Sequence, residues 1–328
     1  MVRTGLAINL PGNAITALGK LGLGAAVAEL GYPIHRREYR SARGKLLFQS
    51  DEDAFWGPGA HPRCVRRSDL LAVLGADIPV RRPATVTAVR PSGAEVEVEI
   101  DGRETQTYGF VAGADGVGSA VRAAVADASG LHVARSSTAS WRFMAPNPGV
   151  DCWTVWSGKA GAFLLIPVDG DEVYGYVSAL DGSDVTDDPA WLDASFGEYP
   201  EPVRMVLATH TKLYHSPIDE VRLDTWAQGR CALVGDAAHA TAPVWAQGGA
   251  LALEDALVLA GVLAGGDWDS AAARYLEARR DRVNHVQHHT DRFTRAAALP
   301  VWLRDRLMPF AGPKSYQATY GPLREPVI

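Results

Sequence analysis

Long apolar runs are missing from this sequence, since no stretch reaches the roughly 18 apolar residues that a membrane-spanning helix needs. Cysteine is scarce as well. The three cysteines, Cys64, Cys152 and Cys231, are widely spaced and odd in number, so we expect reduced, buried thiols in a cytoplasmic protein. Positive charge is not in excess, because the formal net charge is -6 at pH 7. These absences argue against a disulfide framework, a membrane partner and a nucleic-acid-binding surface.

The first part of the chain mixes helical and strand patterns. Hydrophobic residues make up 47% of the 328 positions, which is enough for one large or two medium domains. Residues 13–30 predict a helix that breaks at its glycines, and residues 33–50 predict a hairpin. Ser68 or Asp69 is expected to cap a short helix, and residues 84–112 predict three short strands separated by turn residues.

The second part changes character twice. A helix capped by Ser119 is expected first, and residues 136–222 then predict an antiparallel sheet. Residues 230–234 predict a strand buried on both faces, and residues 249–264 predict a helix that is buried nearly all round. Two more helices are expected, a long amphipathic one at 270–296 and a short one after Pro300 that leads into a loop. The fold class is therefore α/β, with an antiparallel part inserted into a parallel part.

Residues 229–263 carry the strongest chemical signal. The buried strand ends at Gly235 and Asp236, and ligands of open α/β sheets lie beyond such strand ends. The glycine permits close approach of a ligand, and the carboxylate can accept hydrogen bonds from sugar-like hydroxyls. Residues 247–249, Gln-Gly-Gly, precede the buried helix, and their backbone N–H groups suit an anion or a polarised carbonyl. The alternative is a purely structural strand, turn and core helix, in which Asp236 serves only as a cap.

This segment resembles the second FAD motif of the class A flavoprotein monooxygenases, the family of para-hydroxybenzoate and salicylate hydroxylases. The resemblance implies that Asp236 and Gly235 bind the ribityl chain of FAD. It places Pro243 near the isoalloxazine, and it places Gln247, Gly248 and Gly249 at the pyrimidine edge of the flavin. The family usually has Gly-Gln-Gly where this chain has Ala246-Gln247-Gly248. If that first position needs a positive φ, Ala246 would strain the loop.

Three further matches extend the resemblance from residue 3 to about residue 295. Asp115 and Gly116 resemble the Asp-Gly motif of the family, which helps to bind FAD and NAD(P)H. Arg67 matches an arginine at a helix start that can pair with the pyrophosphate, and Arg3 matches an arginine near the FAD. By themselves, Asp115 and Gly116 are equally consistent with a generic turn, and Arg67 is equally consistent with a solvated basic pair. We expect Asp115, Asp236 and residues 247–249 to converge on one crevice.

The first FAD motif of the family, a strand followed by GxGxxG, is not found in this sequence. Residues 19–24 contain glycines with the wrong spacing after a helical pattern. Three explanations remain open: a late start of the chain, a true truncation, or completion of the sheet by another chain. We expect weak or no FAD retention and impaired activity for the 328-residue polypeptide.

Other candidate residues favour structural roles. His285, His288 and His289 lie on one predicted helix, but no carboxylate or cysteine spacing supports a metal, and none is expected. His239 is expected to be a structural histidine that orients the loop beside it. Trp153 and Trp156 are consistent with an aromatic pocket and equally with core packing.

The resemblance implies a flavin-dependent monooxygenase that hydroxylates a small aromatic or polycyclic compound through a C4a-hydroperoxyflavin, with FAD, NAD(P)H and O2. Pro243, Gly248 and Gly249 would lie at the reacting flavin. The protein is expected to be a monomer or homodimer. One alternative is a related flavin oxidation such as epoxidation, and another is a cofactor-free binding or scaffold protein. The expected FAD-binding domain is Rossmann-like and discontinuous, at 1–32, 63–135 and 223–296. The expected β-rich substrate domain is at 33–62 and 136–222. A C-terminal helix and tail are expected at 297–328.

Overall fold

The computed structural model describes residues 6–126, 131–179, 188–210 and 212–328. The chain divides into two compact units. The first unit comprises Met1–Gly75, Ser136–Ile218 and Asp291–Glu325, and the second comprises Ala76–Arg135, Asp219–Thr290 and Pro326–Ile328. Each unit contains segments that are far apart in the sequence, so neither is a continuous stretch of chain.

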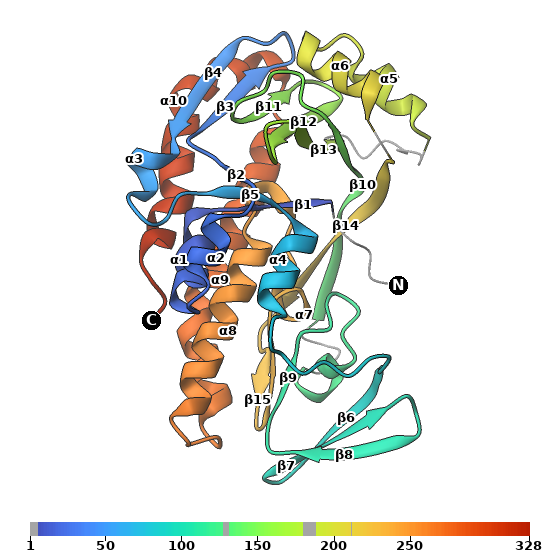
Figure 1. The fold of residues 1–328 in the computed structure, drawn as a ribbon, viewed down its shortest axis with the longest axis vertical. Coiled ribbons are helices and arrows are strands. Elements are labelled where there is room, and N and C mark those ends of the chain that lie inside the picture. The colour runs from blue at the N-terminus through green and yellow to red at the C-terminus, as the bar shows by residue number, and fades with distance from the viewer. Residues whose placement is uncertain (1–5, 127–130, 180–187, 211) are drawn as a thin grey trace. The chain divides into compact units, whose positions relative to one another are not determined.

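A seven-stranded sheet dominates the first unit (Figure 1). Its strand order is β14-β10-β13-β12-β11-β3-β4. Neighbouring strands from β10 to β4 run antiparallel, except that β11 pairs with β3 in parallel. The strands are β3 (Arg36–Ser41), β4 (Leu46–Asp51), β10 (Leu131–Pro146), β11 (Trp153–Ser157), β12 (Gly161–Pro167), β13 (Glu172–Ala179) and β14 (Tyr214–Leu223). The predicted hairpin at 33–50 and the predicted sheet at 136–222 are both confirmed.

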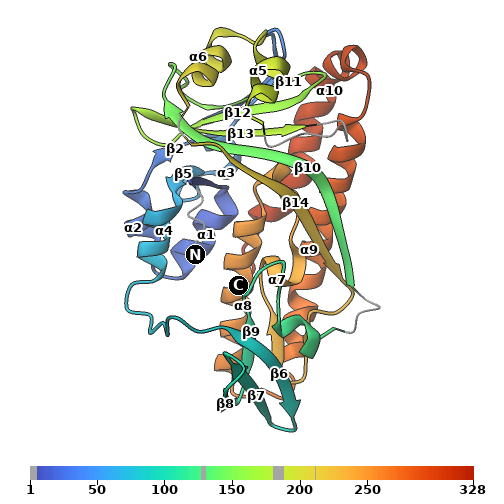
Figure 2. The same cartoon turned by 90° about the vertical axis from the view of Figure 1, so that its right-hand side faces the viewer.

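One face of this sheet packs into an apolar core. Trp141, Phe143, Phe163 and Leu165 point into it and are almost fully buried. Two short helices, α5 (Ala190–Phe196) and α6 (Glu201–Thr209), supply the other side of the core, and they lie beside β11 and β12 in both views (Figures 1 and 2). The sequence analysis missed these helices because their apolar periodicity is too short to stand out within a strand-rich region.

A small sheet of order β1-β5-β2 lies in the same unit, formed by β1 (Ala7–Leu10), β5 (Arg63–Arg66) and β2 (Tyr32–Pro33). The predicted helix at 13–30 is two helices, α1 (Gly12–Lys20) and α2 (Gly24–Ala28), with the break at Gly22. Helix α3 is Glu52–Trp56 and helix α4 is Arg67–Leu74. The predicted cap of α4 was wrong, because the helix begins at Arg67 and Ser68 Oγ donates to Asp69 Oδ1 instead.

The C-terminal tail is more helical than expected. Helix α10 spans Val301–Tyr320 and is followed by the short η4 (Gly321–Arg324). Pro309 and Pro313 lie inside α10 and remove backbone donors, which is why the sequence predicted only a short helix. Burial of Tyr316 and Tyr320 against the first unit compensates for this loss.

The second unit contains a three-stranded sheet of order β15-β16-β9. Its strands are β15 (Ala227–Gln228), β16 (Cys231–Leu233) and β9 (Val111–Gly113), and β16 runs parallel to β9. A separate antiparallel sheet comprises β6 (Val86–Ser92), β7 (Glu95–Ile100) and β8 (Glu104–Tyr108). Long helices α8 (Gly248–Ala264) and α9 (Ala271–Ala297) pack on the β16 side through Leu259, Tyr275 and Val283.

Several expectations for the second unit need correction. The expected strand through residues 107–113 is divided between the end of β8 and β9. In place of the helix after Ser119 the structure has one 3-10 turn, η1 (Val121–Ala124), although Ser119 Oγ does accept the Arg122 N–H at 3.0 Å. Residues 127–128 of that expected helix lie outside the described residues. Helix α8 has buried residues from Ala250 to Leu259, whereas its last turn is partly exposed.

The three cysteines are buried free thiols, as predicted. Among the described residues, no helix is both long and apolar enough to cross a membrane. The proposed domain boundaries stay a prediction. The compact units differ from them chiefly at residues 1–32, 63–75 and 291–325, which cluster with the seven-stranded sheet. Ala7 of β1 and Cys64 of β5 share a core cluster with Met144 and Ile166 of that sheet.

Candidate functional site

The end of strand β16 begins the candidate site. Leu233 of β16 lies in register with Gly113 of β9, so both strands end at the same edge of the sheet. Gly235 follows with φ +59° and ψ -138°, a conformation that is essentially restricted to glycine. Helix α7 (Asp236–His239) starts at once, and the Asp236 side chain is exposed. No other described residue forms a hydrogen bond or ion pair with that carboxylate.

Residues 243–249 form the second element of the site. Pro243 is exposed and opens the short turn η3 (Pro243–Trp245), and Gln247 is the N-cap of α8. A Cβ added at Gly248 would lie 3.6 Å from Asp236 Oδ1, so the strand end and the start of α8 are adjacent. Ala246 has φ +53° and ψ 32°, which confirms that this position needs a left-handed backbone.

The loop that leads into η3 is fixed by β14. The Val221 N–H donates to the Ala240 carbonyl at 2.8 Å, and the Ala242 N–H donates to Glu220 Oε1 at 3.0 Å. Both contacts lie within the second unit. They hold the chain immediately before Pro243, so the position of Pro243 relative to α7 is set by β14.

The Asp115 loop is the third element. Asp115 Oδ2 accepts the backbone N–H groups of Ala120 and Val121 at 2.7 and 3.2 Å. Gly116 has φ +78°, so this turn also requires a left-handed backbone. The carboxylate therefore orders the turn between β9 and η1.

Arg122 joins the Asp115 loop to helix α7. Its Nε and Nη2 atoms donate to the Ala237 carbonyl at 3.0 and 2.9 Å, and its Nη1 donates to the Val117 carbonyl at 2.8 Å. Burial lowers the pKa of Arg122, and the nearby Asp115 carboxylate opposes that effect. One guanidinium thus spans the two motifs, which the sequence analysis expected to converge.

A buried network behind the site was missed by the sequence analysis. Asp255 of α8 accepts the Gly235 N–H at 2.9 Å, His239 Nε2 at 2.7 Å and Arg279 Nε at 2.7 Å. Burial raises the pKa of Asp255, but His239, Arg279 and the Gly235 N–H together lower it to about 2. His239 is therefore a buried structural histidine, as predicted. The signal available was the pair Glu254-Asp255 inside an otherwise apolar helix.

The two remaining predicted site residues lie outside the described part of the second unit. Arg67 is exposed at the start of α4 and belongs to the first unit. Arg3 lies outside the described residues. The structure therefore assembles Asp115, Gly116, Gly235, Asp236, Pro243, Gln247, Gly248 and Gly249 within the second unit alone.

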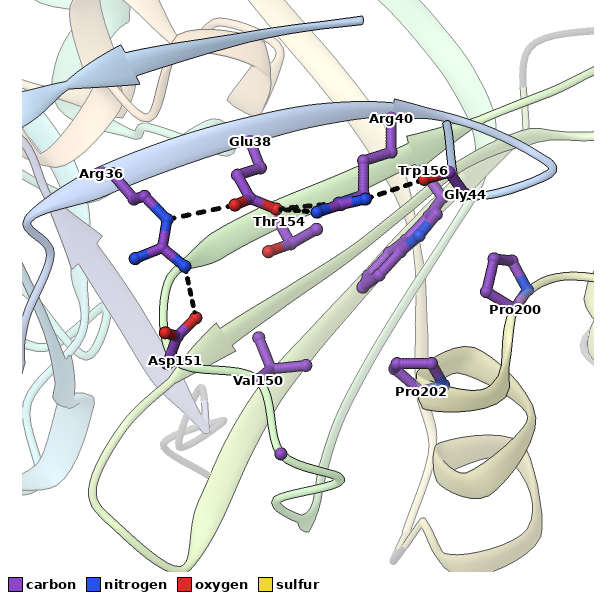
Figure 3. Close-up of a pocket in the computed structure, with 11 residues that line it drawn as sticks. Arg36, Glu38, Arg40, Gly44, Val150, Asp151, Thr154, Trp156, Pro200 and Pro202 are labelled. Atoms are coloured by element: carbon purple, nitrogen blue, oxygen red, sulfur yellow. Dashed lines mark hydrogen bonds and ion pairs between the residues drawn. The ribbon is translucent and has the colours of Figure 1, made fainter. Parts of the chain in front are cut away.

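The first unit contains a separate pocket of about 280 Å³, lined by strands β3 and β11 and by the start of α6 (Figure 3). Glu38 accepts hydrogen bonds from Arg36 and Arg40, and Arg36 also contacts Asp151 at 2.8 Å. Trp156 lines this pocket, whereas Trp153 lies against Tyr39 at a ring-centroid distance of 5.2 Å. The charged groups of the pocket are already paired with one another.

The histidines of α9 lie close together, with 4.5 Å between the ring centroids of His285 and His289. No group of three potential ligands that could hold a metal ion is found among the described residues.

Comparison with known proteins identifies the family. Residues 18–292 match the family described as "FAD binding domain". A 3-amino-4-hydroxybenzoate 2-monooxygenase of Streptomyces platensis is 30% identical over 336 aligned residues, covering 94% of this chain and 83% of that protein. An aurachin C monooxygenase/isomerase of Stigmatella aurantiaca is 29% identical, covering 94% of this chain and 85% of that protein.

A solved structure supports the same fold. HpxO of Klebsiella pneumoniae, in complex with FAD and uric acid, aligns with a TM-score of 0.80 and 24% sequence identity, covering 99% of this chain and 85% of that chain. The predicted α/β fold, a Rossmann-like part with a β-rich part, is thereby confirmed. The chain belongs to the FAD-binding domain family, within the class A FAD-dependent aromatic monooxygenases.

Proposed function

We propose that this protein hydroxylates a small aromatic compound, using FAD held by the second unit, NAD(P)H as reductant and O2 as the oxygen source. The observation that carries the proposal is the position of Asp236. Its exposed carboxylate lies beside Gly248 at the start of α8, and Arg122 ties its helix to the Asp115 loop. This arrangement combines a hydrogen-bond acceptor, a glycine turn and a helix N-terminus in one place.

The residues present fit FAD. The Asp236 carboxylate, which the other described residues leave unpaired, can accept hydrogen bonds from the hydroxyls of a ribityl chain. Gly248 and Gly249 carry no side chains, so a flat ring can approach their backbone closely. The first N–H groups of α8 have no partners within the helix and favour negative charge, as an anionic reduced flavin would carry. Asp236 would hold the sugar chain and residues 247–249 the ring edge.

Bound FAD would supply the redox chemistry of hydroxylation, with NAD(P)H as the reductant and O2 as the oxygen source. The protein's own residues would bind and orient the cofactor and polarise its ring. The N–H groups at the start of α8 would stabilise negative charge on the ring, and Pro243 would present an apolar edge to it. Asp115 and Gly116 would order the loop that meets the cofactors, Arg67 would pair with the pyrophosphate, and Arg3 would bind near the FAD.

The relatives support an aromatic substrate. The Streptomyces protein acts on 3-amino-4-hydroxybenzoate by its name, and HpxO was solved with uric acid. For this chain we propose a small aromatic or fused-ring substrate bound on the β-rich sheet. Use of NAD(P)H and the presence of buried free thiols are consistent with a cytoplasmic location.

Flavin titration of the full chain tests the proposal. Asp236→Asn removes the charge but keeps the shape, and Asp281→Asn on the exposed side of α9 is the matched control. The wild-type chain and the control should bind FAD weakly and with equal affinity, and Asp236→Asn should bind it about 10- to 100-fold more weakly still, the loss expected for a charged hydrogen bond. A folded wild-type chain that binds no FAD would instead favour the cofactor-free binding protein. Equal affinity of Asp236→Asn and wild type would remove Asp236 from the site.

A further inference from the structure

Helix α10 of the first unit has one face buried and the opposite face open to solvent. On the buried face, Gly312 packs directly on Phe48 of β4, because a Cβ added at Gly312 would overlap that ring (Figure 1). Tyr316 donates to Glu52 Oε1 of α3 at 2.6 Å. These contacts fix α10 against β4 and α3, so its open face is held in place.

The open face carries aromatic, apolar and basic side chains. Trp302, Arg306 and Phe310 follow one another at intervals of four residues. Leu307 and Lys314 lie three residues before and four residues after Phe310. Side chains at such intervals share one face of a helix. All five are exposed, and they are called the α10 outer face below.

The aromatic members of the α10 outer face are unusually exposed. The exposed fractions of Trp302 and Phe310 are 71% and 75%, the highest of any large hydrophobic residue in the part of the chain that the structure describes. Leu307 is exposed as well, at 43%. Apolar side chains gathered on one exposed face indicate a contact with a partner, because burying them there would be favourable.

Positive charge surrounds these apolar side chains. Residues 292–314 contain five basic residues and one acidic residue, in a chain whose formal net charge is -6. That acidic residue, Asp305, lies 3.8 Å from the buried Arg304. Arg306 and Lys314 are exposed, and neither forms an ion pair with a described residue. The partner of this face should therefore offer negative charge together with apolar surface.

We propose that the α10 outer face binds the surface of an anionic lipid bilayer, with Trp302 and Phe310 among the headgroups and Arg306 and Lys314 beside the lipid phosphates. Aromatic side chains favour the bilayer interface, and cations next to them are attracted by acidic lipids. The outside of a helix is convex, so it can enter among headgroups without a matching cavity in the partner.

A second copy of the chain fits this face less well. A two-fold contact would place the same patch against itself, and its cations would then repel one another. The lack of long apolar runs in the sequence argues against a spanning helix, but a contact at the bilayer surface needs none. The proposal therefore revises the expectation that the protein has no membrane partner.

Co-sedimentation of the full chain with lipid vesicles tests the charge requirement. Vesicles of phosphatidylcholine alone would be compared with vesicles of phosphatidylcholine and phosphatidylglycerol in equal amounts, at low and at high salt. The chain should bind the mixed vesicles about 10-fold or more tightly. High salt should remove most of that difference, because salt screens exposed charges. Equal binding to both vesicles, or binding to neither, would overturn the proposal.

Substitutions assign the binding to α10. Phe310→Ala should weaken binding to the mixed vesicles about 10-fold or more, and the double variant with Trp302→Ala should weaken it further. Arg306→Gln should weaken it about 5-fold. Tyr108→Ala and Arg43→Gln remove an exposed aromatic ring and an exposed cation elsewhere, so they should leave binding unchanged. Unchanged binding in folded Phe310→Ala or Arg306→Gln would overturn the proposal, and each variant provides a reading if the other unfolds.

Sedimentation velocity without lipid tests the alternative occupant. Phe310→Ala should have the same oligomeric state as the wild-type chain. A wild-type dimer that Phe310→Ala dissociates would show that a second copy covers this face, and it would overturn the proposal. None of these measurements requires FAD, so their outcome is independent of the proposed function.

Discussion

Arg122 donates two hydrogen bonds to the carbonyl of Ala237, a residue 115 positions further along the chain. The same side chain donates to the carbonyls of Gly116 and Val117, which flank the turn after Asp115. The loops that carry Asp115 and Asp236 are therefore held by one guanidinium. This link turns two sequence motifs into one site.

Arg122→Gln should weaken FAD binding although Arg122 is not proposed to touch FAD. Loss of the guanidinium leaves the buried Ala237 carbonyl without this donor, so the chain should also lose about 1–3 kcal/mol of stability. Chemical denaturation and flavin titration would measure both effects. Arg280→Gln, at an exposed position of α9, serves as the control and should change neither. Normal FAD affinity in a folded Arg122→Gln variant would show that the two loops are positioned independently.

Ala246→Gly should stabilise the protein. Ala246 has φ +53°, where a Cβ costs about 1–2 kcal/mol of folding free energy. A glycine avoids this strain, but it also makes the unfolded chain more flexible, which offsets part of the gain. We expect a net gain of about 0.5–1 kcal/mol in urea unfolding. The same substitution at the exposed Ala256 in the middle of α8 should destabilise by about 1 kcal/mol. Effects of the same sign at both positions would contradict the strain at Ala246.

Glu52→Gln should be strongly destabilising. Arg37 Nε lies 3.0 Å from Glu52 Oε2, both side chains are almost fully buried, and Tyr316 of α10 donates to Glu52 Oε1 at 2.6 Å. Removing one charge of such a pair leaves the other uncompensated and costs about 3–5 kcal/mol. The exposed pair Arg81–Glu104 is the control, and Glu104→Gln should change the free energy of unfolding little, because solvent screens the pair. Comparable losses from the two substitutions would contradict the importance of burial.

Acid should destabilise the buried network behind the candidate site. The pKa of Asp255 is lowered from 3.8 to about 2, so its ionised form is favoured by folding. That contribution, about 2 kcal/mol, is complete above the unfolded pKa and is lost as the pH falls from about 4 towards 2. Chemical denaturation across this pH range should show a steeper loss of the free energy of unfolding in wild type than in Asp255→Asn. Equal slopes would mean that Asp255 does not contribute.

The sequence could predict elements whose signal is local. Alternation and turn residues indicated the hairpin at 33–50, and a short apolar run indicated the strand that ends before Gly235. The family resemblance pointed to Ala246 as a position that would be strained if it needs a positive φ, because the family usually has glycine there. In each case the information lies within a few residues.

Features that depend on distant partners were not predictable in the same way. The length of α10 depends on burial of Tyr316 against Glu52, which outweighs two internal prolines. The network around Asp255 needs Arg279 from another helix. Tertiary contacts determine these features, so local sequence patterns do not predict them.

A crystal structure of the full chain with FAD tests the central claim most directly. The account predicts a ribityl hydroxyl within hydrogen-bond distance of the Asp236 carboxylate, with the ring edge against Gly248 and Gly249. FAD bound away from the start of α8, with Asp236 still facing solvent, would contradict it.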